Sequence, residues 1–206
     1  MSLVVLISGN GSNLQAIIDA NIPISAVISN QANAFGVKRA QQAHIPTHII
    51  SNRDFPSREA FDQALLTQIE LYQPKLVVLA GFMRILGEQF IMHFMGRLIN
   101  IHPSLLPKHK GLHTHRHVLE AGDTEHGVSV HYVNANLDGG PIISQSKLTV
   151  EATDNEVSLQ QRVQTLEHRL YPHTIKLILN GRVRLTQDRV VFDGSPLAKS
   201  GIMLNL

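Results

Sequence analysis

The stretch LVVLIS at residues 3–8, followed by GNGSN at residues 9–13, decides the fold. Its apolar, partly β-branched run is typical of a parallel strand that is covered on both faces of a sheet. Leu14, Ile17 and Ile18 then recur at helical spacing, so the glycines fall at a turn between a strand and a helix. The stretch therefore predicts an α/β protein with this first strand near the centre of its sheet.

The turn at Gly11, Ser12 and Asn13 is suited to binding a phosphate. Glycine lets the backbone approach an anion closely, and the free N–H groups at the helix start point towards it. The dinucleotide fingerprint is incomplete, because a leucine takes its third glycine position and no acid follows the strand expected at 24–29. We therefore expect a monophosphate rather than NAD. The alternative is that Ser12 and Gln15 only form a capping box.

The alternation of strands and helices continues along the chain. Hydrophobic periodicity predicts helices at 34–43 and 57–72 and strands at 47–50 and 76–80.

The sequence GFMRIL at 81–86 follows the last of these strands, at the end where open α/β sheets bind ligands. Its apolar groups suit a flat, partly apolar ligand, although core packing of the following helix is the better explanation of these residues taken alone. Arg58 is a solvated surface charge unless the fold brings it to the phosphate turn.

The stretch GRLINIHPSLLP at 96–107 places two polar side chains in an apolar strand that stops at a proline. Side chains alternate along a strand, so Asn100 and His102 share one face. An amide donor beside a His that titrates near neutral pH suits an oxygen that gains negative charge during acyl transfer. Two alternatives stay open: both residues are satisfied core polar groups, or Ser104 is a hydrolase nucleophile without the usual strand-turn-helix elbow.

The polar, proline-bounded segment 108–117 predicts a mobile loop. Its alternating His113, His115 and His117 raise the idea of a metal site, but no carboxylate or cysteine partners lie nearby in the sequence, and a solvated loop is the better interpretation. A half-covered strand at 127–133 and another strand at 141–150 follow, joined by a turn that carries Asp138 before two glycines. By itself, Asp138 is typical turn chemistry.

The C-terminal third contains one long helix that starts at a capping box over 153–156. We expect Pro172 to kink or end this helix. Gln164, Glu167 and His168 lie off its apolar stripe and are expected to face solvent. The segments 183–185 and 190–192 predict a small hairpin, and the tail beyond it is uninformative.

Composition excludes several classes of function. The 206 residues suffice for one large domain or two small ones, and 18 basic against 16 acidic residues leave no basic run that could follow a nucleic-acid backbone. The absence of cysteine excludes disulfides and thiolate nucleophiles and suits a cytoplasmic protein. The apolar N-terminal run is too short to span a membrane. We expect neither a nucleic-acid nor a membrane partner.

Over roughly residues 3–180, the chain resembles the phosphoribosylglycinamide formyltransferase family of folate-dependent enzymes. The resemblance is carried by VVLISGNGSNLQAIIDA, VVLAGFMRIL, LINIHPSLLPKHKGLHTHR, EHGVSVH, LDGGPII and RVQTLEH. It implies a Rossmann-like α/β fold, with a mostly parallel twisted sheet, helices on both faces and a C-terminal folate-side subregion. It also implies a single domain over 1–206, with a ribonucleotide phosphate-binding half at 1–99 and a catalytic, folate-binding half at 100–206 that ends in the small hairpin.

The resemblance implies transfer of a formyl group from 10-formyltetrahydrofolate, a co-substrate, to the amine of N1-(5-phospho-D-ribosyl)glycinamide in purine (IMP) biosynthesis, with no metal. Asp138 would raise the pKa of His102 and keep it protonated near neutral pH. The implied site residues are, for catalysis, Asn100, His102 and Asp138; for the ribonucleotide, Gly11, Ser12, Asn13, Gln164 and Glu167; and for folate, Arg58, Met83, Arg84, Ile85, Leu86 and Asn100.

Three other functions compete with this interpretation. A methionyl-tRNA formyltransferase would call for an added C-terminal RNA-binding domain, and a formyltetrahydrofolate deformylase for an N-terminal regulatory domain. A non-catalytic ribonucleotide-binding protein would not need Asn100, His102 and Asp138 together. The expected partners are small-molecule substrates, and the expected assembly is a monomer or weak homodimer.

Overall fold

The computed structural model describes residues 2–205, which form two compact units that divide between Asn100 and Ile101. Residues 1 and 206 of the predicted 1–206 domain lie outside the described residues. The division into two compact units does not show which ligand each unit binds. The predicted division into a ribonucleotide-binding half and a folate-binding half between residues 99 and 100 therefore stays a prediction.

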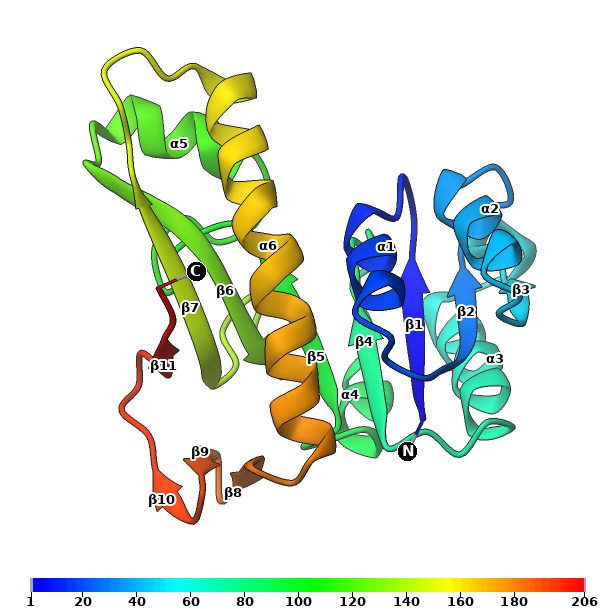
Figure 1. Ribbon diagram of the computed structural model, residues 1–206. Helices are drawn as coiled ribbons and strands as arrows, with labels where there is room; N and C mark the ends of the chain where they lie inside the picture. The colour runs from blue at the N-terminus through cyan, green and yellow to red at the C-terminus, as the bar shows by residue number, and fades with distance from the viewer. Residues whose placement is uncertain (1, 206) are drawn as a thin grey trace. The chain divides into compact units, whose positions relative to one another are not determined.

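The first unit contains parallel strands in the order β3-β2-β1-β4-β5, and the last two residues of β5 belong to the second unit. Their bounds are β1 Leu3–Ile7, β2 Ile24–Ser29, β3 Thr47–Ile49, β4 Leu76–Leu79 and β5 Leu98–His102. Every residue of β1 and β4 is buried, as expected for apolar strands covered on both faces. The predicted mostly parallel α/β sheet with flanking helices is confirmed (Figure 1).

The helices of this unit follow the predicted alternation, and a 3₁₀ turn, η1, precedes α3. Their bounds are α1 Ser12–Asp19, α2 Phe35–Gln42, η1 Asn52–Asp54, α3 Arg58–Glu70 and α4 Glu88–His93. The capping-box alternative for α1 is wrong, because its N-cap is Gly11, at φ 72, and no side chain caps it. A Cβ on Gly11 would lie 2.6 Å from Cα of Gly36, so the turn also needs glycine for packing.

The second unit is built on the antiparallel pair β6 (Glu125–Tyr132) and β7 (Ile142–Thr149). The long helix α6 (Glu156–Leu179) contacts both strands, and α5 (Thr114–Ala121) contacts α6 (Figure 1). All of β6 after its first residue is buried. The prediction that this strand is half-covered is therefore wrong.

Helix α6 differs from its prediction at three points. Its N-cap is Asn155, and the capping box joins Asn155 with Ser158 rather than spanning 153–156. Pro172 does not end the helix, which continues to Leu179. Pro172 is itself buried. The burial of the apolar face of α6 offsets the loss of the backbone hydrogen bond that a proline cannot donate. Gln164, Glu167 and His168 are half-buried, so the expectation that they face solvent is wrong.

The C-terminal segment contains the predicted hairpin. Strands β8 (Val183–Thr186) and β9 (Arg189–Phe192) pair antiparallel, and β10 (Ser195–Pro196) adds to β9. The tail then returns as β11 (Ile202–Met203), which pairs parallel with β7. The sequence pattern did not predict this last strand.

Gly140, at the end of the turn between β6 and β7, should tolerate no side chain. A Cβ there would lie 1.8 Å from the carbonyl oxygen of Tyr132, and backbone cannot give way as a flexible side chain can. We expect Gly140→Ala to lower the free energy of unfolding by about 2–3 kcal/mol, measured by urea denaturation. Gly9→Ala is the matched control, since nothing lies within 4 Å of a Cβ at that position. Equal stability of the two variants would contradict the expectation.

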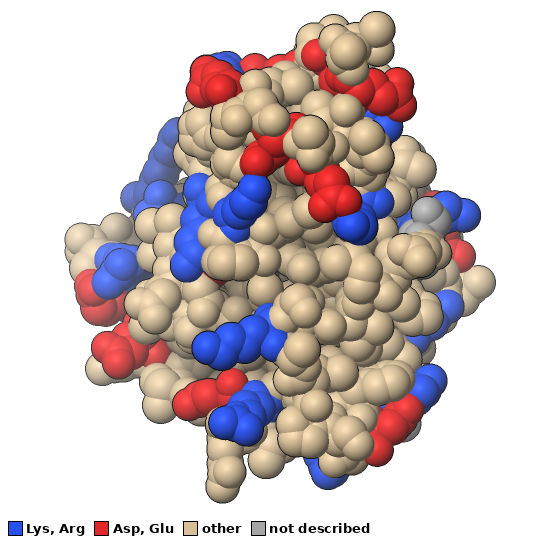
Figure 2. All heavy atoms as spheres, turned by 90° about the vertical axis from the view of Figure 1, so that its left-hand side faces the viewer, with Lys and Arg blue, Asp and Glu red and all other residues tan. Residues whose placement is uncertain are grey.

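The face shown in Figure 2 carries basic and acidic side chains in small, interspersed groups. A continuous basic stripe, which a nucleic-acid backbone would need, is not seen on that face. Among residues 2–205, no helix combines the length and apolar character that a membrane span requires.

Candidate active site

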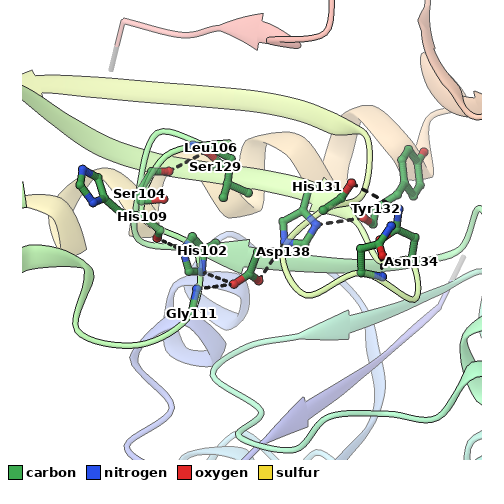
Figure 3. Close-up of polar contacts among 12 residues, drawn as sticks. His102, Ser104, Leu106, His109, Gly111, Ser129, His131, Tyr132, Asn134 and Asp138 are labelled. Carbon is green, nitrogen blue, oxygen red and sulfur yellow. Dashed lines mark hydrogen bonds and ion pairs between the residues drawn. The ribbon is translucent and has the colours of Figure 1, made fainter. Parts of the chain in front are cut away.

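The end of β5 and the turn after β6 bring His102 and Asp138 together. Nδ1 of His102 lies 3.3 Å from Oδ2 of Asp138, and both side chains are less than a tenth exposed. Asp138 sits in the turn at φ 45, and the backbone N–H of Gly111 donates to its Oδ2 at 2.9 Å (Figure 3). Asp138 therefore performs the turn chemistry expected of it and also faces His102.

The other ring nitrogen of His102 indicates which tautomer is present. Nε2 lies 2.9 Å from the carbonyl oxygen of His109. A carbonyl oxygen only accepts hydrogen bonds, so Nε2 carries a hydrogen and donates it. In the neutral ring, Nδ1 is then an unprotonated base that faces the carboxylate of Asp138.

The expectation that Asp138 raises the pKa of His102 overall is wrong. Burial has the largest influence and lowers the pKa of His102 below its ordinary 6.5. The carbonyl of His109 and the carboxylate of Asp138 both act to raise that pKa, but they do not outweigh burial. His102 is therefore mainly neutral near pH 7, with Nδ1 able to accept a proton.

His131 is a site residue that the sequence analysis did not identify. Its Nδ1 donates to the carbonyl oxygen of Tyr132 at 2.9 Å, and its Nε2 lies 3.7 Å from Oδ1 of Asp138. Burial acts to raise the pKa of Asp138, but the contact with His131, the hydrogen bond from Gly111 and the nearby ring of His102 together outweigh it and leave the pKa below its ordinary value. A His near the end of a predicted strand, next to a turn that contains an Asp, was the signal.

Asn100 lies on β5, two residues before His102, and its side chain is half-buried. Strand alternation places the two side chains on the same side of the strand, as predicted.

The segment 108–117 is only partly the predicted loop, because residues 114–117 form the first turn of α5. The sequence did not predict this helix because α5 buries only Thr114 and Val118 and therefore shows no apolar stripe. Alternate residues diverge on a helix, so the strand-like spacing of the histidines does not bring them together. Among residues 2–205, no group of three or more His, Asp or Glu side chains could hold a metal ion.

His126 lies on β6 with its Nε2 3.0 Å from Nδ1 of His115, and burial lowers its pKa to about 3. The unfolded chain, with an ordinary pKa near 6.5, binds this proton more readily than the folded protein does. Stability is therefore fully present above pH 6.5 and is lost as the pH falls below it, by up to about 1.4 kcal/mol per pH unit for this group.

Replacing His126 with Gln should reduce that acid sensitivity. We expect the free energy of unfolding of His126→Gln to fall less between pH 7 and pH 5 than that of the unmodified protein, as measured by urea denaturation at both values. His173→Gln is the control, because His173 is exposed on α6. An unchanged pH slope for His126→Gln would show that His126 is not the titrating group.

Met83 and Arg84, two of the predicted folate-binding residues, line a cavity of about 610 Å³ in the first unit. The other lining residues are Ser8, Asn30, Gln31, Asn33, Asn52 and Arg53, which the sequence analysis did not identify. Of the remaining predicted residues, Arg58 is exposed beside Glu59, Ile85 is exposed and Leu86 is buried.

Gly11, Ser12 and Asn13 lie at the start of α1, where no side chain caps the helix. Backbone N–H groups in that position can bind an anion. This geometry is compatible with the predicted phosphate turn.

Comparison with known proteins gives one consistent answer. The family model described as formyl transferase matches residues 1–175. The chain is 54% identical to phosphoribosylglycinamide formyltransferase of Escherichia coli K12, over 98% of both chains, and 43% identical to that of Haemophilus influenzae, over 97% of both. The solved phosphoribosylglycinamide formyltransferase of Coxiella burnetii aligns with a TM-score of 0.97 and 55% identity, over 99% of each chain.

Proposed function

The chain belongs to the formyl transferase family, and from this premise we propose how its active site works. It transfers a formyl group from 10-formyltetrahydrofolate to the amine of N1-(5-phospho-D-ribosyl)glycinamide in purine biosynthesis, as the relatives of that name do. The observation that carries the mechanism is the buried pair of His102 and Asp138, with Nε2 of His102 fixed as a donor.

His102 moves the proton of the reaction. As the acceptor amine forms its bond to the formyl carbon, Nδ1 of neutral His102 takes the proton that the attacking nitrogen must lose. Asp138 stabilises the resulting imidazolium, since an adjacent carboxylate favours the charged ring. His102 then gives the proton to the folate nitrogen as its bond to the formyl carbon breaks. Bound 10-formyltetrahydrofolate supplies the activated formyl group and this leaving nitrogen.

Asn100 donates a hydrogen bond to the carbonyl oxygen as negative charge develops on it. We expect Asn100→Ala to lower kcat about 100-fold, the usual cost of removing one oxyanion donor. Asn100→Asp is the informative comparison, because it keeps the shape but loses the N–H donor. A loss in Asn100→Ala that Asn100→Asp restores, measured as steady-state kcat, would show that size rather than hydrogen bonding matters.

The binding residues are assigned by proposal. We propose that Gly11, Ser12 and Asn13 hold the phosphate and that Gln164 and Glu167 contact the ribonucleotide. We propose the folate set as Arg58, Met83, Arg84, Ile85, Leu86 and Asn100. The residues that line the cavity support part of this folate set. Arg84 and Arg53 are among them, and their guanidinium groups suit the carboxylates of a folate.

One experiment separates the proposed function from its alternatives. Release of tetrahydrofolate from 10-formyltetrahydrofolate is followed with and without glycinamide ribonucleotide. Release that requires the acceptor supports the formyl transfer. Release without the acceptor indicates a deformylase, and no release in either case indicates a non-catalytic binding protein.

We further propose that the protein acts in the cytoplasm, as a monomer or weak homodimer, without a nucleic-acid or membrane partner. The interspersed charges in Figure 2 and the near-balance of 18 basic and 16 acidic residues support this proposal. Sedimentation at micromolar concentration tests the assembly.

A further inference from the structure

The carbonyl group that accepts the hydrogen of His102 belongs to a residue with an uncommon backbone conformation. His109 has a φ of 50, in the left-handed region that residues other than glycine seldom adopt. This conformation needs support from neighbouring groups. The support matters for His102, because the place of the His109 carbonyl decides which ring nitrogen of neutral His102 carries the hydrogen.

The side chain of His109 is anchored by Asp123. Nε2 of His109 lies 2.6 Å from Oδ2 of Asp123, and both side chains are about four-fifths buried. Lys108 binds the other oxygen of Asp123 at 2.8 Å but is mostly exposed. Asp123 directly follows Gly122, the C-cap of α5, and its N–H donates to the carbonyl oxygen of Val118. The anchor is therefore fixed to the end of a helix.

The turn that leads to His109 is fixed independently. Oγ of Ser104 donates to the carbonyl oxygen of Lys108 at 2.7 Å. Oγ of Ser129 on β6 donates to the carbonyl oxygen of Ser104 at 2.6 Å, and Figure 3 shows these two serines side by side. The amide of Gln145 on β7 donates to the carbonyl oxygen of Leu106 at 2.9 Å. These bonds hold the backbone up to Lys108, and the contact with Asp123 holds the next residue.

We propose that Asp123 is a positioning residue for the formyl transfer, which fixes the carbonyl of His109 and thereby keeps the hydrogen of neutral His102 on Nε2. The proposal rests on the proposed function. Two acceptors compete for that hydrogen, because Asp138 lies 3.3 Å from Nδ1 and favours the opposite tautomer. With the hydrogen on Nδ1, the base of the reaction is blocked. Asp123 favours the reactive tautomer.

The charge of Asp123 suits this role. Hydrogen bonds from Lys108 and then His109 lower the pKa of Asp123, so its carboxylate is ionised throughout the neutral range. It can accept from His109 whenever the enzyme is active.

The test is the tautomer of His102 in protein labelled with ¹⁵N-histidine, read by NMR above pH 7 and assigned with His102→Asn. In the unmodified protein the hydrogen is expected on Nε2. In Asp123→Ala we expect a substantial share of Nδ1–H and a kcat about tenfold lower, with both KM values unchanged. Because the tautomer is read without turnover, failure of this inference is distinguishable from failure of the proposed function.

Three further variants show whether the effect of Asp123 on His102 depends on its contact with His109. Lys108→Gln removes the other partner of Asp123 and should leave both the tautomer and kcat unchanged. His109→Asn tolerates the left-handed backbone but loses the imidazole, so it should repeat the effect of Asp123→Ala and also serves if that variant does not fold. Asp123→Asn keeps an oxygen acceptor and should recover part of the Nε2–H signal. An unaltered tautomer in both Asp123→Ala and His109→Asn would overturn the proposal, as would an equal change in Lys108→Gln.

Discussion

Replacing His102 with alanine is expected to lower kcat by about 1000-fold or more. The variant loses the only group in the proposed mechanism that both accepts the proton of the attacking amine and returns it to the leaving nitrogen. It also leaves the carboxylate of Asp138, which is less than a tenth exposed, without the ring that faces it. Single-turnover measurements with both substrates saturating report the chemical step directly.

The matched control for this variant is His117→Ala. His117 lies on α5 and is exposed, so its loss should leave kcat unchanged. Near-normal turnover in folded His102→Ala would refute the proposed role of His102 while leaving the family assignment intact.

The Asp138→Asn variant is expected to lower kcat by between about 100- and 1000-fold and to change its pH dependence. The kcat of the unmodified enzyme should fall as the pH drops through the lowered pKa of His102, because the neutral ring is the active form. Asp138 acts to raise that pKa. Without the carboxylate the pKa falls further, so the acid limb of the kcat profile should move to lower pH.

The pH profile separates this effect from simple damage to the turn. Asp188→Asn is the control, because Asp188 is an exposed residue that also has a left-handed φ, of 58. If Asp138→Asn loses activity with its acid limb in the original place, Asp138 does not act through His102.

The central strands could be predicted from the sequence because the apolar character of each short run is enough to indicate that the strand is buried. The apolar runs at Leu3–Ile7 and Leu76–Leu79 have only one favourable environment, a sheet covered on both faces. The strand with Asn100 and His102 was equally predictable from its alternation. The approach of Asp138 to His102 was not, because it joins two elements distant in sequence, and only the resemblance to a family implied it.

The lowered pKa of His102 could not be predicted, because it depends on burial rather than on the nearest charge. The sequence suggested a carboxylate partner but did not show how little water reaches the ring. The contact between His109 and Asp123 was hidden for a related reason. The polar segment 108–117 was expected to be a loop, whereas its last four residues begin α5. This helix brings Asp123, which follows its C-cap, back to His109.

The pairing of β11 with β7 has a consequence for the solubility of the folded chain. An uncovered edge strand offers a row of free N–H and C=O groups to other molecules, which is a common route to aggregation. Ile202 and Met203 pair with Ser144 and Gln145, and the N–H of Leu204 donates to the carbonyl oxygen of Gln145. Ile202, Met203 and Leu204 thus shield β7 along this part of its edge from pairing with a second molecule.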